Sequence, residues 1–168
     1  MIPTLHTKRL TLRASKDSDA AALGAFLESS RAAWIGGPWP ASDAPDWLAH
    51  CQAQWAVRGR GQWIVALRSD DTPIGRVGLL DHTDWPEPEL AWFLFEGYEA
   101  QGYAHEAATA ARAHANGPMG LPALFSFIEP ANERSCRLAE RLGAHHERDV
   151  RFQDLDFQVY RHPLGVGA

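Results

Sequence analysis

One stretch, residues 89–115, restricts the possible folds of this 168-residue chain more than any other. It begins with Glu89 and continues as an apolar and aromatic run to Phe95, which is the composition of a buried strand. After a short connection that contains Gly102, an alanine-rich run from Tyr103 predicts a helix. A tight turn from strand to helix leaves the first helical N–H groups unpaired at the positive end of the helix dipole. The junction is either an ordinary connection, in which the glycine only permits the turn, or a binding site for phosphate.

Strand and helix patterns alternate along the rest of the chain. Apolar and aromatic runs predict further strands over residues 9–13, 63–67, 74–80 and 123–128, and a closing antiparallel pair between Val150 and Tyr160. Capping residues at Asp17–Asp19, at Ser42 or Asp43, and at Asn132 precede three further predicted helices. This order predicts an α+β fold with one mixed sheet flanked by helices, in a single domain that covers residues 1–168.

Two glycines, Gly75 and Gly78, lie inside the strand predicted over residues 74–80. Glycine weakens a strand because it has no side chain to pack and loses more conformational entropy on folding than other residues. A β-bulge, a closely approaching neighbouring backbone or a bound ligand would each explain their presence.

Composition and charge exclude several classes of partner. The formal net charge of −5 argues against a broad electrostatic grip on nucleic acid or on an anionic membrane, so any anionic ligand must be held locally. Cys51 and Cys136 stand alone in predicted helices, which favours two reduced, buried thiols and no metal site. The N-terminus has no apolar run of signal-peptide length and no segment approaches a membrane span, so we expect a cytoplasmic protein.

Three stretches form recognisable motifs: Thr7-Lys8-Arg9-Leu10-Thr11-Leu12-Arg13, Tyr98-Glu99-Ala100-Gln101-Gly102-Tyr103-Ala104-His105-Glu106-Ala107, and the helix from Asn132 through Ser135 to Leu142-Gly143-Ala144. Together they resemble the GNAT (Gcn5-related) N-acetyltransferases, and in particular their ribosomal-protein N-terminal acetyltransferase branch. The second resembles the family's pyrophosphate loop. The resemblance covers nearly the whole chain and implies a mostly antiparallel central sheet, splayed at its fourth and fifth strands.

The resemblance also implies acetyl-CoA as co-substrate. Backbone groups near Phe93, Leu94 and Phe95 would pair with the pantetheine arm. The pyrophosphate would be held by the N–H groups of Gln101, Gly102, Tyr103, Ala104 and His105. Asn132 would orient the pantetheine and can cap its own helix as well.

The implied reaction is direct transfer of the acetyl group to a primary amine. Glu89 is the candidate base or amine-orienting group, and the alternative is a surface carboxylate at the start of a strand. Ser135 is the candidate partner of the thiolate, and the alternative is a serine that bonds only its own backbone. His82 is a second candidate base. Arg134 and Arg137 would meet cofactor phosphates or form a solvated helix face.

Three positions depart from the family pattern. Glu99 stands where Gln or Arg is usual, Ala100 where glycine is common, and Ala139 in the place of a tyrosine that serves many relatives as general acid. Because a carboxylate repels pyrophosphate, we expect Glu99 to offer its backbone N–H while its side chain points to water. These departures keep open a non-catalytic acyl-CoA-binding regulator, beside which we considered a structural module without a nucleotide site.

The acceptor is left open between a protein N-terminal amine and a small-molecule amine. Trp34, Trp39, Trp47, Trp85 and Trp92 would either pack as core or form an aromatic acceptor cleft that suits an apolar body with a basic amine. Members of the family often dimerise, so a homodimer is compatible with the resemblance.

Overall fold

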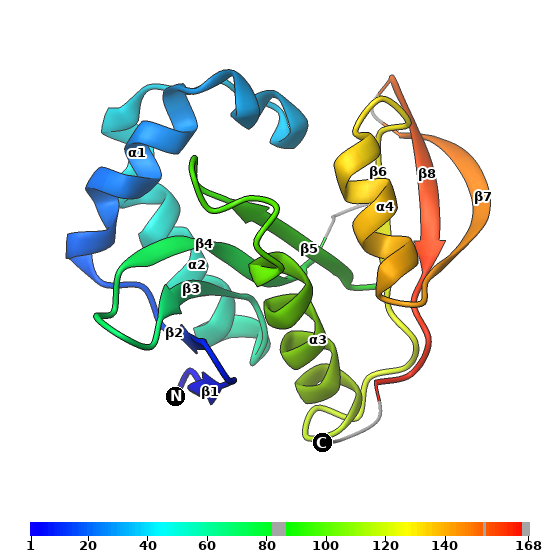
Figure 1. Cartoon of the computed structure of the whole chain (residues 1–168), viewed down its shortest axis with the longest axis horizontal. Coiled ribbons are helices and arrows are strands. Elements are labelled where there is room, and N and C mark those ends of the chain that lie inside the picture. Colours follow the sequence, from blue (N-terminus) through cyan, green and yellow to red (C-terminus); the bar gives the residue numbers. More distant parts are fainter. Residues whose placement is uncertain (82–86, 153, 166–168) are drawn as a thin grey trace.

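The fold is built around an eight-stranded sheet in a computed structural model that describes residues 1–81, 87–152 and 154–165 (Figure 1). The strands are β1 (Leu5–His6), β2 (Leu10–Arg13), β3 (Gln62–Leu67), β4 (Pro73–Leu80), β5 (Glu89–Leu94), β6 (Phe125–Ile128), β7 (His145–Phe152) and β8 (Leu155–Arg161). The helices are α1 (Ala20–Glu28), α2 (Ala44–Arg58), α3 (Tyr103–Asn116) and α4 (Glu133–Arg141), with short 3₁₀ turns η1 (Asp17–Asp19), η2 (Ser30–Ile35) and η3 (Ala41–Asp43).

The order of the strands is β1-β2-β3-β4-β5-β6-β8-β7, and all neighbours are antiparallel except β5 and β6. The predicted α+β architecture, with a mixed and mostly antiparallel sheet, is therefore confirmed. Within the described residues, no helix combines the length and apolar character needed to cross a membrane.

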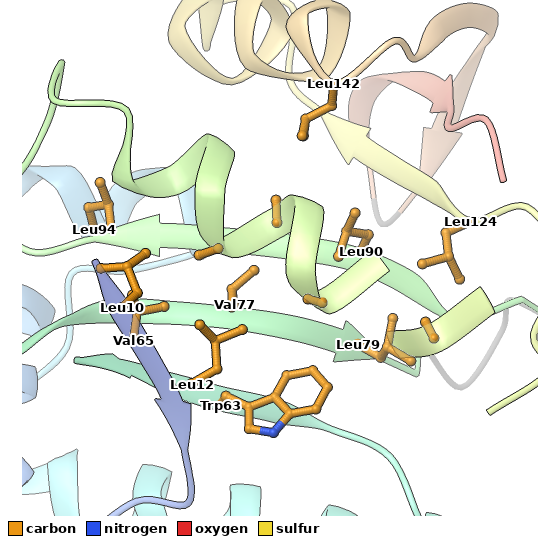
Figure 2. Packing of buried hydrophobic residues seen from close by; sticks show 14 of the residues in the cluster. Leu10, Leu12, Trp63, Val65, Val77, Leu79, Leu90, Leu94, Leu124 and Leu142 are labelled. Atoms are coloured by element: carbon orange, nitrogen blue, oxygen red, sulfur yellow. The ribbon is translucent and has the colours of Figure 1, made fainter. Parts of the chain in front are cut away.

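Helices cover both faces of the sheet. On one face the small side chains of α3, from Ala107 to Ala115, allow that helix to lie close to β2–β5, and their cluster includes Leu10, Val77 and Leu90 (Figure 2). On the other face α1 and α2 bury Leu23, Phe26 and Leu48 against Ile64 and Phe95. The fourth helix packs on β6 and β8 through Ala139 beside Ile128 and Tyr160. These layers place the β5–α3 connection next to the point where β5 and β6 separate.

The parallel pair β5–β6 is joined through one register pair, Glu89 with Phe125, and then diverges (Figure 1). These are the predicted fourth and fifth strands, because β1 is a two-residue strand that the sequence pattern did not indicate. Two side-chain bonds strengthen the junction: Glu89 Oε1 accepts from the Phe127 N–H at 3.0 Å, and Ser126 Oγ donates to the Leu90 carbonyl at 2.5 Å. The splay implied by the resemblance is therefore present.

Both cysteines lie in helices as predicted, and neither forms a disulfide. Cys51 in α2 is buried, whereas Cys136 in α4 is half-buried, so the prediction of two buried thiols is wrong for Cys136. Cys136 faces β8, where its Sγ lies 3.7 Å from Gln158 Oε1.

Candidate active site

Three residues in the connection from β5 to α3 have the left-handed backbone conformation. Gly97, Ala100 and Gly102 have φ angles of 88°, 59° and 81°. The Gln101 side chain donates to the Gly97 carbonyl at 2.9 Å and closes the loop on itself. Glycine enters the left-handed region without the steric cost that a Cβ imposes, which explains why glycine is common where Ala100 stands.

The N-terminus of α3 leaves its amides open. Gly102 is the N-cap and supplies no capping side chain, and the first bond of the helix runs from the Glu106 N–H to the Gly102 carbonyl. The N–H groups of Tyr103, Ala104 and His105 therefore have no partner within the helix, and no described residue accepts from them. The predicted pyrophosphate amides thus lie together at the positive end of a helix dipole.

Arg9, which lies just before β2, supports this loop. Its guanidinium donates from Nη1 to the Gln101 carbonyl at 2.9 Å, pairs through Nε with Glu106 Oε2 at 2.7 Å, and lies 4.4 Å from the centre of the Tyr103 ring. Partial burial raises the pKa of Glu106, but hydrogen bonds from Thr7 and Arg9 outweigh it and lower the pKa overall. Sequence reasoning used Arg9 only as part of a strand motif, because its role depends on β2 lying beside α3.

The expectation that the Glu99 side chain points to water is wrong. Glu99 pairs with Arg31 of η2, and each side chain is only 27% exposed. Burial and then repulsion from Arg134 lower the pKa of Arg31, while Glu96 opposes both. The unfavourable charge in the loop is therefore neutralised by a cation from another part of the chain.

The two arginines predicted on α4 have different surroundings. Arg137 pairs with Glu133 one turn away, and both side chains are about 70% exposed, which is a solvated helix face. The charge of Arg134 acts on Arg31, so Arg134 belongs with the charged groups beside the loop.

The start of α4 forms a second wall of the splay. Asn132 Oδ1 accepts from the Ser135 N–H at 3.3 Å, which confirms the predicted cap. Ser135 is half-buried, and in the described part of the chain its hydroxyl has no hydrogen-bond partner. The alternative that this hydroxyl bonds only the backbone of its own helix is therefore wrong.

Ala139 is buried against a tyrosine from another element. It shares a small core cluster with Tyr160 of β8, whose hydroxyl donates to Gln158 Oε1 at 3.2 Å. Burial first, and then the neighbouring Cys136, raise the pKa of Tyr160 to about 12. At the position where many relatives have a tyrosine, this chain therefore has an alanine that packs in the core.

The edge of β5 that faces the splay is defined by two hydrogen bonds. Phe95 N–H donates to the Ile74 carbonyl of β4 at 2.8 Å, whereas the Leu90 carbonyl points towards β6 and Ser126. Backbone groups alternate in direction along a strand, so Trp92 and Leu94 also turn towards β6. Of the predicted positions Phe93, Leu94 and Phe95, only Leu94 turns its backbone towards the splay, and Trp92, which the prediction did not name, does so as well.

Glu89 lies at the start of this edge. It is 6% exposed, so the alternative of a surface carboxylate is wrong. Its side chain projects to the same face of the sheet as those of Ala91 and Phe93, because side chains two residues apart share a face. That face is the one covered by α1 and α2, since Phe93 stacks on Phe26 with 4.4 Å between ring centres.

A cavity of about 580 Å³ opens on this face, between α2 and the β3–β5 part of the sheet. Its lining residues are Ile35, Asp46, Trp47, His50, Cys51, Gln54, Gln62, Arg76, Leu80, Ala91, Trp92 and Phe93. The volume is in the range of pockets for small ligands. Arg76 was not predicted as a site residue, although a charged residue within an apolar strand is a sequence signal.

The predicted tryptophan cleft is only partly realised. Trp47 and Trp92 line the cavity, Trp39 packs on Trp47 with 4.9 Å between ring centres, and Trp34 is 45% exposed. Trp85 and the candidate base His82 lie outside the described residues. The described ranges also hold no group of three or more His, Cys, Asp or Glu side chains placed to bind a metal.

A buried histidine completes the junction below the splay. Ser126 Oγ gives its proton to the Leu90 carbonyl, so it accepts from His162 Nε2, which lies 2.9 Å away. Burial first, and then the charges of Arg112 and Arg161, lower the pKa of His162 to about 4. His162 is therefore neutral at pH 7 in the folded protein.

We expect His162 to make stability depend on pH. The unfolded histidine binds a proton near pH 6.5 and the folded one only near pH 4, so stability is full above pH 6.5 and falls as the pH decreases towards 4. The loss between pH 7 and pH 5 should be about 2 kcal/mol. Urea unfolding at both pH values measures it. His162→Gln should flatten the dependence by that amount, and an unchanged slope would contradict the assignment.

Comparisons with known proteins agree with this geometry. The model of the acetyltransferase (GNAT) domain matches residues 9–145. An acetyltransferase structure from Agrobacterium tumefaciens str. C58 is 37% identical, covers 97% of this chain and 95% of that one, and has a TM-score of 0.87. The uncharacterized protein YkkB of Bacillus subtilis (strain 168) is 24% identical over 160 residues, 93% of each chain.

One structure similar in fold contains the cofactor. RimL, a ribosomal L7/L12 alpha-N-protein acetyltransferase in complex with coenzyme A, has a TM-score of 0.79 at 15% identity, over 97% of this chain and 99% of that one. At this identity the likeness establishes the fold alone. The family match covers most of the chain, and with the splayed sheet and the open α3 amides it leads to one conclusion: the chain belongs to the GNAT acetyltransferase family.

Proposed function

We propose that this protein transfers an acetyl group from acetyl-CoA directly to a primary amine. The observation that carries the proposal is the splay between β5 and β6, which lies beside the open N-terminus of α3. The pantetheine arm would pair with the backbone of Trp92 and Leu94, as an added strand does. The pyrophosphate would accept from the amides at Tyr103–His105.

The chemistry needs a proton acceptor for the amine and a hydrogen-bond donor for the sulfur. As the amine attacks the thioester carbon, a C–N bond forms, and collapse of the tetrahedral intermediate breaks the C–S bond. Glu89, a buried carboxylate at the start of the splayed strand, takes the amine proton, directly or through water. Ser135 donates its hydroxyl hydrogen bond to the departing thiolate.

A second candidate function is a non-catalytic acyl-CoA-binding regulator. The observation that favours it is Ala139, buried in the core where many relatives have a tyrosine that serves as general acid. In this alternative the cofactor binds and no amine is acetylated.

Thermal unfolding with and without acetyl-CoA, followed by thiol release in the presence of an amine panel, tests the proposal. Acetyl-CoA at about 100 times its Kd should stabilise the fold by about 2.7 kcal/mol, which corresponds to about 5–10 °C in Tm. S-acetylpantetheine lacks the pyrophosphate and should shift Tm less at the same concentration. No shift with acetyl-CoA would contradict the cofactor site, whereas a shift without thiol release from any amine would favour the regulator.

A further inference from the structure

The central strand β4 carries a buried cation, Arg76, that has no counter-ion among the described residues. Arg76 is 2% exposed, and in the described part of the chain its guanidinium forms no hydrogen bond and no ion pair. Its Nη1 is buried, and no residue within the described ranges accepts a hydrogen bond from it. A buried charge destabilises a fold unless it is paired, and the described residues provide no negative charge for Arg76.

The surroundings of Arg76 compensate it only in part. The guanidinium lies 5.9 Å from the centre of the Trp47 ring and 5.8 Å from that of Phe93, which are cation–π distances. Burial lowers the pKa of Arg76 to about 10, so the group remains protonated at pH 7. An anion placed against it would therefore be attracted strongly, in a site screened from water.

Arg76 lines the cavity between α2 and the sheet, and a second unpartnered polar atom lines it too. The side-chain oxygen of Gln54 is buried and has no donor in the described chain. In the part of the chain that the structure describes, the cavity therefore has one donor, Arg76 Nη1, without an acceptor and one acceptor, Gln54 Oε1, without a donor. Around them stand apolar and aromatic walls that include Ile35, Trp47 and Phe93.

We propose that this cavity binds the acceptor, and that the acceptor is a small amine with a carboxylate and an apolar or aromatic body. Arg76 holds the carboxylate, because the planar guanidinium matches its two oxygens in a bidentate pair. Gln54 accepts a hydrogen bond from an N–H of the acceptor. The inference rests on the proposed acetyltransferase function and specifies its substrate class.

The position of the cavity suits an acceptor site. Ala91, Trp92 and Phe93 of β5 line it, and β5 is also the strand whose other edge faces the cofactor splay. The bound acceptor and the thioester would therefore meet at the same strand, the acceptor on its face and the thioester at its edge. Polycationic amines do not fit, because the guanidinium repels them where their charge would be buried.

Matched pairs of amines test the carboxylate directly. L-phenylalanine, L-tryptophan and L-leucine are compared with phenethylamine, tryptamine and isoamylamine, and also with phenylalaninamide, which keeps the shape and removes the charge. With acetyl-CoA in excess, kcat/KM should be about 10²-fold higher for each amino acid than for its partner without a carboxylate, the size expected for a desolvated charge pair. Equal rates, or faster acetylation of the amines that lack a carboxylate or of a peptide N-terminus, would overturn the inference.

Variants at Arg76 identify the group responsible. Arg76→Met should lower kcat/KM for phenylalanine about 10²-fold and leave that for phenethylamine within a few-fold. Its Tm should equal or exceed that of the parent, because an unpaired buried charge is replaced by an apolar side chain. Arg76→Lys keeps the charge without the bidentate fork, and its kcat/KM for phenylalanine should lie between those of the parent and of Arg76→Met. Arg151→Met, at an exposed arginine of β7, is the matched control and should leave both rates unchanged.

Two measurements separate failure of this inference from failure of the proposed function. Calorimetric titration of phenylalanine into the protein with coenzyme A detects acceptor binding without turnover, and binding that Arg76→Met abolishes supports the site. If acetyl-CoA stabilises the protein and amines are acetylated but carboxylates have no advantage, only the substrate class is wrong. If acetyl-CoA neither binds nor reacts, the proposed function fails.

Discussion

Replacing Gly78 by alanine should destabilise the protein by about 3 kcal/mol or more. Gly78 has a φ of 148°, and an added Cβ would lie 2.4 Å from the Gly61 carbonyl oxygen and 2.6 Å from the Gln62 Cα. Both neighbours are backbone atoms at the start of β3, so the contact cannot be relieved by a side-chain rotation. Urea unfolding of the purified variant measures the loss.

Gly59→Ala is the matched control. Gly59 ends α2 with a φ of 65°, and nothing lies within 4 Å of its added Cβ. The only cost there is the left-handed backbone conformation of the alanine, which should lower the free energy of unfolding by about 1 kcal/mol. If both variants lost the same amount, backbone crowding would not be the reason for Gly78. Gly75 is the parallel case on the other side of β4, where a Cβ would lie 2.3 Å from the Phe93 carbonyl oxygen.

Glu89→Gln and Ser135→Ala should each lower kcat by about 10²-fold or more, because each removes a group proposed to move or hold charge in the chemical step. Glutamine keeps a side-chain oxygen for the Phe127 N–H, so the link between β5 and β6 should survive in Glu89→Gln. The Tm shift caused by acetyl-CoA should therefore match that of the parent in both variants. Steady-state acetylation kinetics and thermal unfolding measure the two quantities.

A structural role for Glu89 has a different signature. Glu89→Ala removes both the carboxylate and the acceptor for Phe127, and it should cost about 1–3 kcal/mol of stability in addition to activity. If Glu89→Gln kept its rate within a few-fold while Glu89→Ala lost stability, Glu89 would be a structural link and not a base. A rate within a few-fold of the parent for Ser135→Ala would likewise contradict its assignment to the thiolate.

Much of the fold was predictable because its signals are local. The strand from Glu89 to Phe95, the turn at Gly102 and the helix from Tyr103 follow from residue patterns that act within a few positions. The cap of α4 by Asn132 is local in the same way, and it forms as predicted. For Gly75 and Gly78 the pattern signalled a constraint but left a bulge, a close backbone and a ligand as alternatives. The close strand backbone explains Gly78, whereas at Gly75 a close backbone and an irregular register with β3 occur together.

The parts of the site that were not predicted depend on residues distant in sequence. Glu99 was expected to point to water, but it meets Arg31, which lies 68 positions earlier and reaches it only because η2 folds over the loop. Arg9, just before β2, supports the β5–α3 loop through the Gln101 carbonyl, and His162, just after β8, reaches Ser126 of β6. Hydrogen bonds and ion pairs of this kind leave no periodic trace in a sequence, because each partner is a single residue.

The sequence by itself indicated the order of the elements, because hydrophobic periodicity, capping and glycine turns act over short ranges. It also indicated the family through three stretches that resemble it, and that resemblance predicted a place for the cofactor. The tertiary structure alone decided which charges are neutralised and which are not. It pairs Glu99 with Arg31, joins Glu89 to Phe127, and leaves Arg76 buried beside a cavity with no counter-ion among the described residues. Burial and electrostatic pairing are properties of the packed chain, so the proposed acceptor site follows only from the assembled strands and helices.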